Sequence, residues 1–237
     1  MEKVGIFGYG EVGKAIAKFY QKPKIKDKKR DDGLKDLDIL HICIPYSKDF
    51  VKIVKKQIRE SNPNLTIIHS TVPVGTTAKI GGVIVHSPVR GKHPDLYQGI
   101  KTFVKFVGYE NNVAGSLAKK HFEKLGLKVK LIFDARNTEA LKLWDTTQYG
   151  LMIILNKEIK KFCDKNKLDF DFIYTLGNRT YNEGYLKLKL PEVVRPWLKY
   201  VPGKVGGHCI IPNCRLLKSD IAKLVLKKNR TLKNTTT

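Results

Sequence analysis

The first thirteen residues decide the fold: the apolar run Val4-Gly-Ile-Phe7 leads directly into Gly8-Tyr9-Gly10-Glu11-Val12-Gly13 and then into a helical stretch. In a strand–turn–helix unit of this kind each glycine has a task. Gly8 makes the tight turn, Gly10 lets a diphosphate approach the backbone, and Gly13 lets helix and strand pack closely. The start of the helix adds N–H groups and the positive end of its dipole. The pattern predicts that residues 8–13 bind a dinucleotide.

An acidic residue about 20 positions after the first glycine completes this unit, and Asp27 follows Gly8 at about that distance. Its carboxylate can accept hydrogen bonds from the adenosine ribose, which favours NAD. The cluster Lys28-Lys29-Arg30 comes next and could instead hold the 2′-phosphate of NADP. A solvated charge in a charged loop is an equally open interpretation of Asp27.

Beyond this unit, short β-branched runs alternate with helical stretches as far as residue 134. This alternation predicts an α/β fold, with a Rossmann-type, mostly parallel sheet covered on both faces. The predicted strands are 3–7, 24–26, 38–44, 65–69, 83–86, 103–108 and 128–133, and the predicted helices are 12–21, 48–60 and 112–125.

After residue 134 the apolar residues follow a helical spacing from 137 to 166, which predicts one helix about 42 Å long. A helix of that length needs a continuous partner, either the rest of the chain or a second subunit. We expect a Rossmann domain over 1–134, the long helix with a small, mainly helical domain over 135–228, and a frayed tail over 229–237.

Composition limits the class of protein. The 237 residues are 42% hydrophobic and 28% charged, as in ordinary globular proteins. The longest apolar runs suit a buried strand and are too short to span a membrane. The N-terminus lacks the pattern of a secretory signal. The four cysteines are widely spaced without a CxxC pair, which is typical of a reduced, cytoplasmic protein rather than a disulfide or zinc framework.

The net charge of +23 comes from 37 lysines and 8 arginines against 22 acidic residues. Readers of nucleic-acid sequence depend on arginine for bidentate contacts, whereas a lysine excess along the whole chain gives a diffuse field. No known nucleic-acid-binding motif accompanies the charge. A solvated surface is the preferred interpretation, attraction to anionic substrates or polyanions the second, and a basic nucleic-acid-associated module the third.

Five further motifs then follow in order. They are Cys43-Ile-Pro-Tyr-Ser47, Ser70-Thr-Val-Pro-Val-Gly-Thr-Thr77, Ser87-Pro-Val-Arg-Gly91, Thr138-Glu-Ala-Leu-Lys142 and Gly206-Gly-His-Cys-Ile-Ile-Pro-Asn213. The series resembles the UDP-glucose/GDP-mannose dehydrogenase family over about residues 3–217. Its last motif looks most like the UDP-N-acetylmannosamine dehydrogenase branch.

The resemblance implies two successive oxidations of a nucleotide-sugar C6 alcohol with two NAD⁺. Cys209 would add to the aldehyde as a thiolate and carry the acyl group as a thioester, while Lys142 would stabilise the oxyanion. The same resemblance implies cofactor contacts from Pro45, Ser70 and Thr71 and close approach of the substrate at Gly206 and Gly207. A buried apolar cysteine and a solvated lysine are the alternatives for Cys209 and Lys142, and His208 is either a thiolate partner or a packing residue.

Three positions depart from the family pattern. Asn213 stands where the family has Asp, Thr146 where it has Asn, and Val89 where it has Glu. By their positions, Asn213 and Thr146 join Cys209 and Lys142 as the candidate catalytic residues. Neither Asn213 nor Val89 can act as a base or carry a negative charge. The alternative hypothesis is therefore a dinucleotide-binding protein that has lost the four-electron chemistry and serves as a sensor, a subunit or a single-hydride enzyme.

The chain also ends soon after the last motif, so we expect no further nucleotide-binding domain. The polar and aromatic segment 177–185 could bind an anionic or hydroxylated ligand facing the cysteine loop, and a hydrogen-bonded surface turn is equally open. Its candidate ligand-binding residues are Asn178, Arg179, Tyr181, Asn182 and Tyr185. By the same resemblance, pairing of two long helices (137–166) would make a homodimer.

Overall fold

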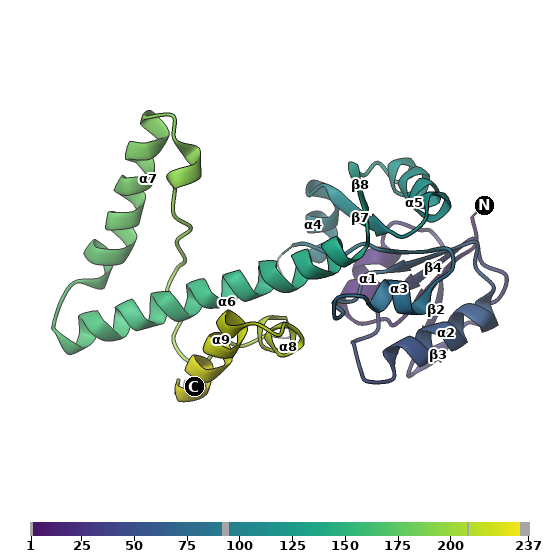
Figure 1. The fold of residues 1–237 in the computed structure, drawn as a ribbon, viewed down its shortest axis with the longest axis horizontal. Coiled ribbons are helices and arrows are strands. Elements are labelled where there is room, and N and C mark those ends of the chain that lie inside the picture. The colour runs from purple at the N-terminus through teal and green to yellow at the C-terminus, as the bar shows by residue number, and fades with distance from the viewer. Residues whose placement is uncertain (1, 92–94, 208, 233–237) are drawn as a thin grey trace. The chain divides into compact units, whose positions relative to one another are not determined.

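The computed structural model describes residues 2–91, 95–207 and 209–232. The chain divides into two compact units after Lys142, within the long helix (Figure 1). In the part of the chain that the structure describes, no helix is both long and apolar enough to cross a membrane.

The first unit is built on one sheet, for which eight strands can be assigned among the described residues in the order β3-β2-β1-β4-β5-β6-β7-β8. Neighbouring strands run parallel except at the β2–β3 and β6–β7 pairs, which are antiparallel. Since β1 pairs with both β2 and β4, the chain reverses its direction of travel across the sheet at β1, where α/β proteins bind their ligands. The strands are β1 (Val4–Phe7), β2 (Lys24–Asp27), β3 (Arg30–Asp31), β4 (Ile39–Ile42), β5 (Leu65–Ile68), β6 (Ile84–His86), β7 (Lys105–Tyr109) and β8 (Val129–Phe133).

Helices cover both faces of this sheet, and each face has its own apolar core. One core joins the sheet to α1 (Glu11–Ala17), α4 (Leu96–Thr102) and α5 (Asn112–Lys124). The other joins it to α2 (Phe50–Ser61) and α3 (Thr76–Ile80). The predicted Rossmann-type α/β fold is confirmed, and all seven predicted strands are present. Strand β3, of two residues, and the short helices α3 and α4, of five and seven residues, were not predicted.

A row of polar side chains crosses the interior of this unit. The Tyr20 hydroxyl lies 2.8 Å from both His41 Nε2 and His121 Nε2, and His41 Nδ1 lies 2.9 Å from His69 Nε2. The row ends at two acceptors: the Ser87 carbonyl, 2.9 Å from His69 Nδ1, and Glu2 Oε2, 3.1 Å from His121 Nδ1. Burial lowers the pKa values of His41 and His69 well below the usual value, so both rings are neutral.

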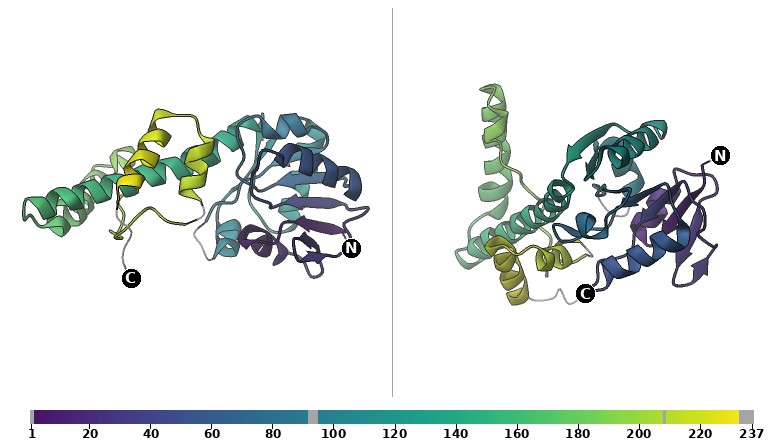
Figure 2. Two further views of the ribbon diagram at one scale, coloured as in Figure 1. Left: turned by 90° about the horizontal axis from the view of Figure 1, so that it is seen from below. Right: turned by 45° about the vertical axis from the view of Figure 1, so that its right-hand side comes forward.

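The second unit contains the rest of α6 (Arg136–Lys165), α7 (Gly177–Lys187), α8 (Ile210–Leu216) and α9 (Asp220–Thr231). Its small core lies between α6, α8 and α9, whereas α7 lies apart from α8 and α9 in Figure 1 and in the right-hand view of Figure 2. Helix α6 matches the predicted range 137–166 closely. Because α9 continues through Thr231, the first residues of the tail predicted to be frayed are helical; residues 233–237 lie outside the described residues.

Candidate functional site

The glycine loop after β1 has the geometry that its sequence predicts. Gly8 has φ +97°, and a Cβ there would lie 2.7 Å from the backbone of Cys43 and Ile44. A Cβ on Gly13 would lie 2.0 Å from the Gly8 carbonyl oxygen. At Gly10, by contrast, no atom of the described residues lies within 4 Å of a Cβ. Two glycines are therefore required by backbone packing, while the third leaves open space beside the start of α1, as a bound diphosphate requires.

Asp27, the last residue of β2, holds this loop in place. Its Oδ2 accepts a hydrogen bond from the Tyr9 N–H at 2.5 Å, and its Oδ1 accepts one from the Lys28 N–H at 2.7 Å. These two donors lower the pKa of Asp27, so the carboxylate is ionised. The Arg30 guanidinium is paired with Asp32, with Nη2 2.7 Å from Oδ2. Within the basic cluster Lys28-Lys29-Arg30, the arginine therefore already has a carboxylate partner.

The next two motifs meet at the same edge of the sheet, since both follow parallel strands. The Ser70 hydroxyl, which is buried, donates to the Ile44 carbonyl at 2.6 Å and so joins the loop after β5 to the loop after β4. Pro45 is exposed and Thr71 is half-buried. Of the three residues predicted to contact the cofactor, Ser70 therefore has its hydroxyl occupied in fixing the loops.

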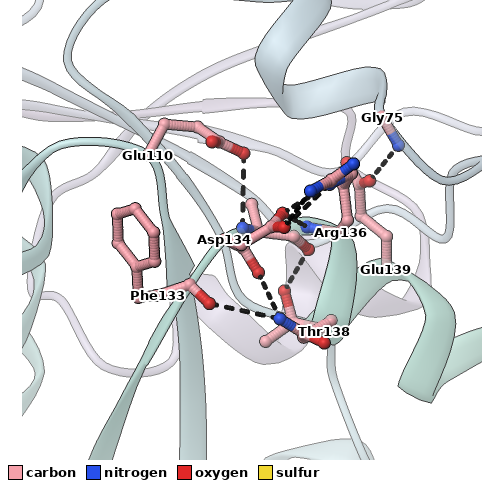
Figure 3. A network of polar contacts seen from close by, with 9 residues as sticks. Gly75, Glu110, Phe133, Asp134, Arg136, Thr138 and Glu139 are labelled. Carbon is pink, nitrogen blue, oxygen red and sulfur yellow. Dashed lines mark hydrogen bonds and ion pairs between the residues drawn. The ribbon is translucent and has the colours of Figure 1, made fainter.

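The start of α6 gathers the other motifs of this unit, in a polar network drawn in part in Figure 3. The buried Glu139 carboxylate accepts from the Gly75 N–H at 2.5 Å, the Thr77 N–H at 2.8 Å and the Thr77 hydroxyl at 2.7 Å. One residue earlier, the Thr138 hydroxyl lies 2.9 Å from His86 Nδ1. Burial raises the pKa of Glu139 although these donors act in the opposite direction. Glu139 thus fixes the loop that follows Ser70.

Lys142, one turn further along α6, contacts the segment after β6. Its Nζ donates to the Val89 carbonyl at 2.8 Å. The same segment receives a second lysine, because Lys105 Nζ lies 2.9 Å from the Ser87 carbonyl and 3.1 Å from the Pro88 carbonyl. Four of the five motifs of the predicted series are therefore brought together in the first unit.

Sequence reasoning missed two of the residues that build this region. Glu139 was available as a signal, since it lies inside the motif 138–142 next to the lysine that was selected. Lys105 gave only a weak signal, a lysine at the start of a β-branched run, and it could not be separated by sequence from the other 36 lysines.

In the second unit, two of the positions that depart from the family pattern contact each other. The Asn213 side-chain amide donates to the Thr146 hydroxyl at 3.2 Å, and that hydroxyl donates to the Leu143 carbonyl at 3.1 Å. Asn213 is buried on α8, and Cys209 precedes the first residue of that helix. The structure thus brings three of the predicted catalytic residues into one unit, with a neutral pair where the family has Asn and Asp.

The glycines before Cys209 are open to a ligand. Gly207 has φ +80°, and at both Gly206 and Gly207 no described atom lies within 4 Å of a Cβ. His208, predicted as a thiolate partner or packing residue, lies outside the described residues.

The predicted ligand-binding segment 177–185 is helical, in place of a loop or surface turn. Asn182 exchanges two 2.8 Å hydrogen bonds with the backbone of Arg195, whose guanidinium lies 3.5 Å from the centre of the Tyr181 ring. These contacts of Asn182 and Tyr181 hold the segment after α7 against the helix.

The other residues of that prediction also make contacts along the helix. Asn178 donates to the Tyr174 carbonyl at 2.7 Å, the Tyr185 ring packs on that of Tyr181 at 4.6 Å, and Arg179 lies 4.0 Å from Glu183. Since α7 lies apart from α8 (Figure 1), the structure does not bring these residues to the cysteine loop.

Comparison with known proteins agrees with this geometry. No protein-family model matches the chain. It is 28% identical over 186 residues to the UDP-N-acetyl-D-mannosamine dehydrogenase of Methanococcus vannielii, covering 76% of this chain and 39% of that protein. It is also 28% identical over 213 residues to the enzyme of the same name from Methanocaldococcus jannaschii, covering 79% and 46%. The UDP-D-ManNAc dehydrogenase structure from Pyrococcus horikoshii, at 21% identity, superposes with a TM-score of 0.70 over 93% of this chain and 55% of that one.

The sheet, its glycine loop and the solved structure define a Rossmann-type α/β fold. The curated proteins agree with the resemblance that the motifs predict: over about three quarters of its length this chain is similar in sequence to UDP-N-acetyl-D-mannosamine dehydrogenases. It spans between about two fifths and one half of the length of the curated relatives it matches.

Proposed function

We propose that this chain binds NAD at residues 8–13 and takes part in oxidising the primary alcohol of a nucleotide sugar. The observation that carries the proposal is the glycine loop, in which Gly8 and Gly13 are packed against backbone while Gly10 faces open space. The substrate class is taken from the UDP-N-acetyl-D-mannosamine dehydrogenases that the chain resembles.

NAD fits the end of β2 better than NADP does. The Asp27 carboxylate is ionised there and would repel a 2′-phosphate, whereas it can accept hydrogen bonds from ribose hydroxyls. The Arg30 guanidinium, which could have attracted the phosphate, is paired with Asp32.

Bound NAD⁺ would supply the hydride acceptor, and the chain's own residues would manage the substrate. The Lys142 ammonium group would stabilise negative charge on the substrate oxygen while a carbonyl forms. The Cys209 thiol would then add across the aldehyde carbonyl, its sulfur to the carbon and its hydrogen to the oxygen, to give a thiohemiacetal. Transfer of the C–H hydride to a second NAD⁺ and loss of the hydroxyl proton to water would leave a thioester. Water would attack that thioester, releasing the uronic acid and restoring the thiol.

A second candidate function is favoured by the Thr146–Asn213 contact. Both side chains are neutral, and neither can take a proton from the attacking water. A chain with this pair would bind the dinucleotide and transfer one hydride, or none, without completing the second oxidation.

Stoichiometry separates the two candidates. The full chain is incubated with NAD⁺ and UDP-N-acetylmannosamine, and the NADH formed per sugar is followed by absorbance. Two equivalents, abolished in Cys209→Ala, support the thioester mechanism. One equivalent, or NADH binding without turnover, supports the second candidate. Failure to bind NADH at millimolar concentration contradicts both.

The dinucleotide site itself is tested by filling the space at Gly10. Gly10 has an extended backbone, with φ −72° and ψ −162°, that valine tolerates, so Gly10→Val should fold normally and lose most of its NADH affinity. Gly184→Val is the matched control, because Gly184 also faces open space but lies on α7. Equal NADH affinity in Gly10→Val and the wild type would contradict the proposal.

We also propose that the chain forms a homodimer through α6. Trp144, Leu155 and Phe162 are 45%, 46% and 59% exposed, and their spacing of 11 and 7 positions places them on one face of the helix. Such an apolar face is typical of a subunit interface. Sedimentation of a single monomeric species at micromolar concentration would contradict this proposal.

A further inference from the structure

Lys105 is a buried lysine in the interior of the sheet. It is the first residue of β7 and only 3% exposed, with its Nζ 5.5 Å from the centre of the Phe122 ring. Burying an ammonium group without partners is costly, and burial lowers the pKa of Lys105 to about 7. A lysine buried at this position is therefore expected to make specific hydrogen bonds.

The Lys105 amine donates hydrogen bonds to backbone carbonyls in the segment after β6. The Ser87 and Pro88 carbonyls both accept from Lys105 Nζ, at 2.9 and 3.1 Å, and the Ser87 carbonyl also accepts from His69 Nδ1 at 2.9 Å. Pro88 has no N–H of its own. Side chains of Lys105 on β7 and of His69 just after β5 therefore supply hydrogen-bond donors to these two carbonyls.

The next residue of the segment holds the candidate catalytic lysine. The Val89 carbonyl accepts from Lys142 Nζ at 2.8 Å, so two lysines contact three consecutive carbonyl groups. The α6 end of this arrangement is also held in place, since Glu139 is bonded to the loop after β5 and Thr138 to His86 at the end of β6. The position of the Val89 carbonyl is therefore one determinant of where the Lys142 amine lies.

We propose that Lys105 is a positioning residue: by holding the carbonyls of Ser87 and Pro88, it sets the Val89 carbonyl and thereby the amine of Lys142. Its effect on catalysis rests on the proposed function, in which Lys142 stabilises the substrate oxygen. The effect of Lys105 on the Lys142 amine is independent of the proposed function, because it follows from contacts within the first unit.

The amine is tested without any turnover. The full chain is labelled with trace acetic anhydride, and the acylation rate of each lysine is measured by mass spectrometry after digestion. In Lys105→Met, Lys142 should be acylated about fivefold faster than in the wild type, the effect of about one lost hydrogen bond. Lys105→Arg, which keeps the donors, should restore the slow rate. Lys130→Met is the matched control, because Lys130 lies on the adjacent strand β8 and is exposed.

An unchanged Lys142 rate in a folded Lys105→Met chain overturns the proposal. If that variant does not fold, Lys105→Gln, whose amide still donates to one carbonyl, is measured instead, and the same criterion applies to it.

A kinetic comparison tests the catalytic part. Lys105→Met should lower kcat about tenfold or more while the NADH dissociation constant stays unchanged, and Lys105→Arg should recover kcat. A parallel loss of NADH affinity would mean a general structural role and would overturn the assignment. A wild type without turnover would contradict the proposed oxidation of a nucleotide sugar, while the labelling result would still decide whether Lys105 positions Lys142.

Discussion

Removing the Glu139 carboxylate is expected to destabilise the first unit strongly. The side chain is fully buried and accepts three hydrogen bonds, two from backbone N–H groups and one from a hydroxyl that can turn to another acceptor. In Glu139→Ala the Gly75 and Thr77 N–H groups lose their partner, at about 1–3 kcal/mol for each buried donor left unpaired. Relief from burying a charge offsets part of this cost, since burial raises the pKa of Glu139. We expect a net loss of about 3 kcal/mol, or about 6–12 °C in Tm for a chain of this size.

Thermal and urea unfolding, followed by circular dichroism, measure this loss. Glu139→Gln keeps one acceptor oxygen but points an amide at a donor, so it should fall between Ala and the wild type. Glu123→Gln is the matched control, because Glu123 is half-exposed on α5 and pairs only with Lys119 on the surface among its described contacts; its stability should change by less than about 0.5 kcal/mol. A Glu139→Ala chain as stable as that control would refute the role given to the carboxylate.

Three further changes test other parts of the molecule. Asp27→Asn removes the charge beside the Tyr9 N–H, so fluorescence titration should show weaker NADH binding and a smaller preference over NADPH; an unchanged ratio would contradict the choice of NAD. The pKa of Lys105 is about 7 in the folded chain and 10.5 in the unfolded chain, so between these pH values the unfolded state binds one more proton. The free energy of unfolding of the wild type, measured in urea, should therefore rise with pH across this range, and this rise should be missing in Lys105→Met. Parallel pH profiles of the two chains would be evidence against the burial of the Lys105 amine. Leu155→Glu places a charge on the exposed face of α6, so it should sediment as a monomer where the wild type dimerises.

The fold was predictable wherever elements were long or apolar. The sheet strands are short runs of Val and Ile, and the long helix has a regular apolar spacing over 30 residues. Helix α7 was not predicted, because its sequence carries two glycines and several polar residues that are typical of turns. It is helical because contacts such as the pairing of Asn182 with Arg195 stabilise it.

The site was predictable only in part, for a physical reason. The conformation of a glycine loop depends on local backbone geometry, so the roles of Gly8 and Gly13 can be recognised from the sequence. The tasks of Glu139 and Lys105 depend on partners 62 and 18 positions away, and no local pattern encodes those distances. The contact between Thr146 and Asn213 likewise joins residues 67 positions apart.

The row of histidines in the first unit has a consequence for where protons can reside. Both of its ends, the Glu2 carboxylate and the Ser87 carbonyl, only accept, while each neutral ring and the Tyr20 hydroxyl between them offer one hydrogen apiece. The row has five hydrogen-bond contacts, whereas its four neutral groups (His121, Tyr20, His41 and His69) supply only four hydrogens, so one more hydrogen is needed. His121 is the natural carrier, beside Glu2, yet burial holds its pKa below the usual value. When the pH rises through the pKa of His121, that hydrogen leaves. One position in the row then has no hydrogen, so two lone pairs face and repel each other in the interior of the protein.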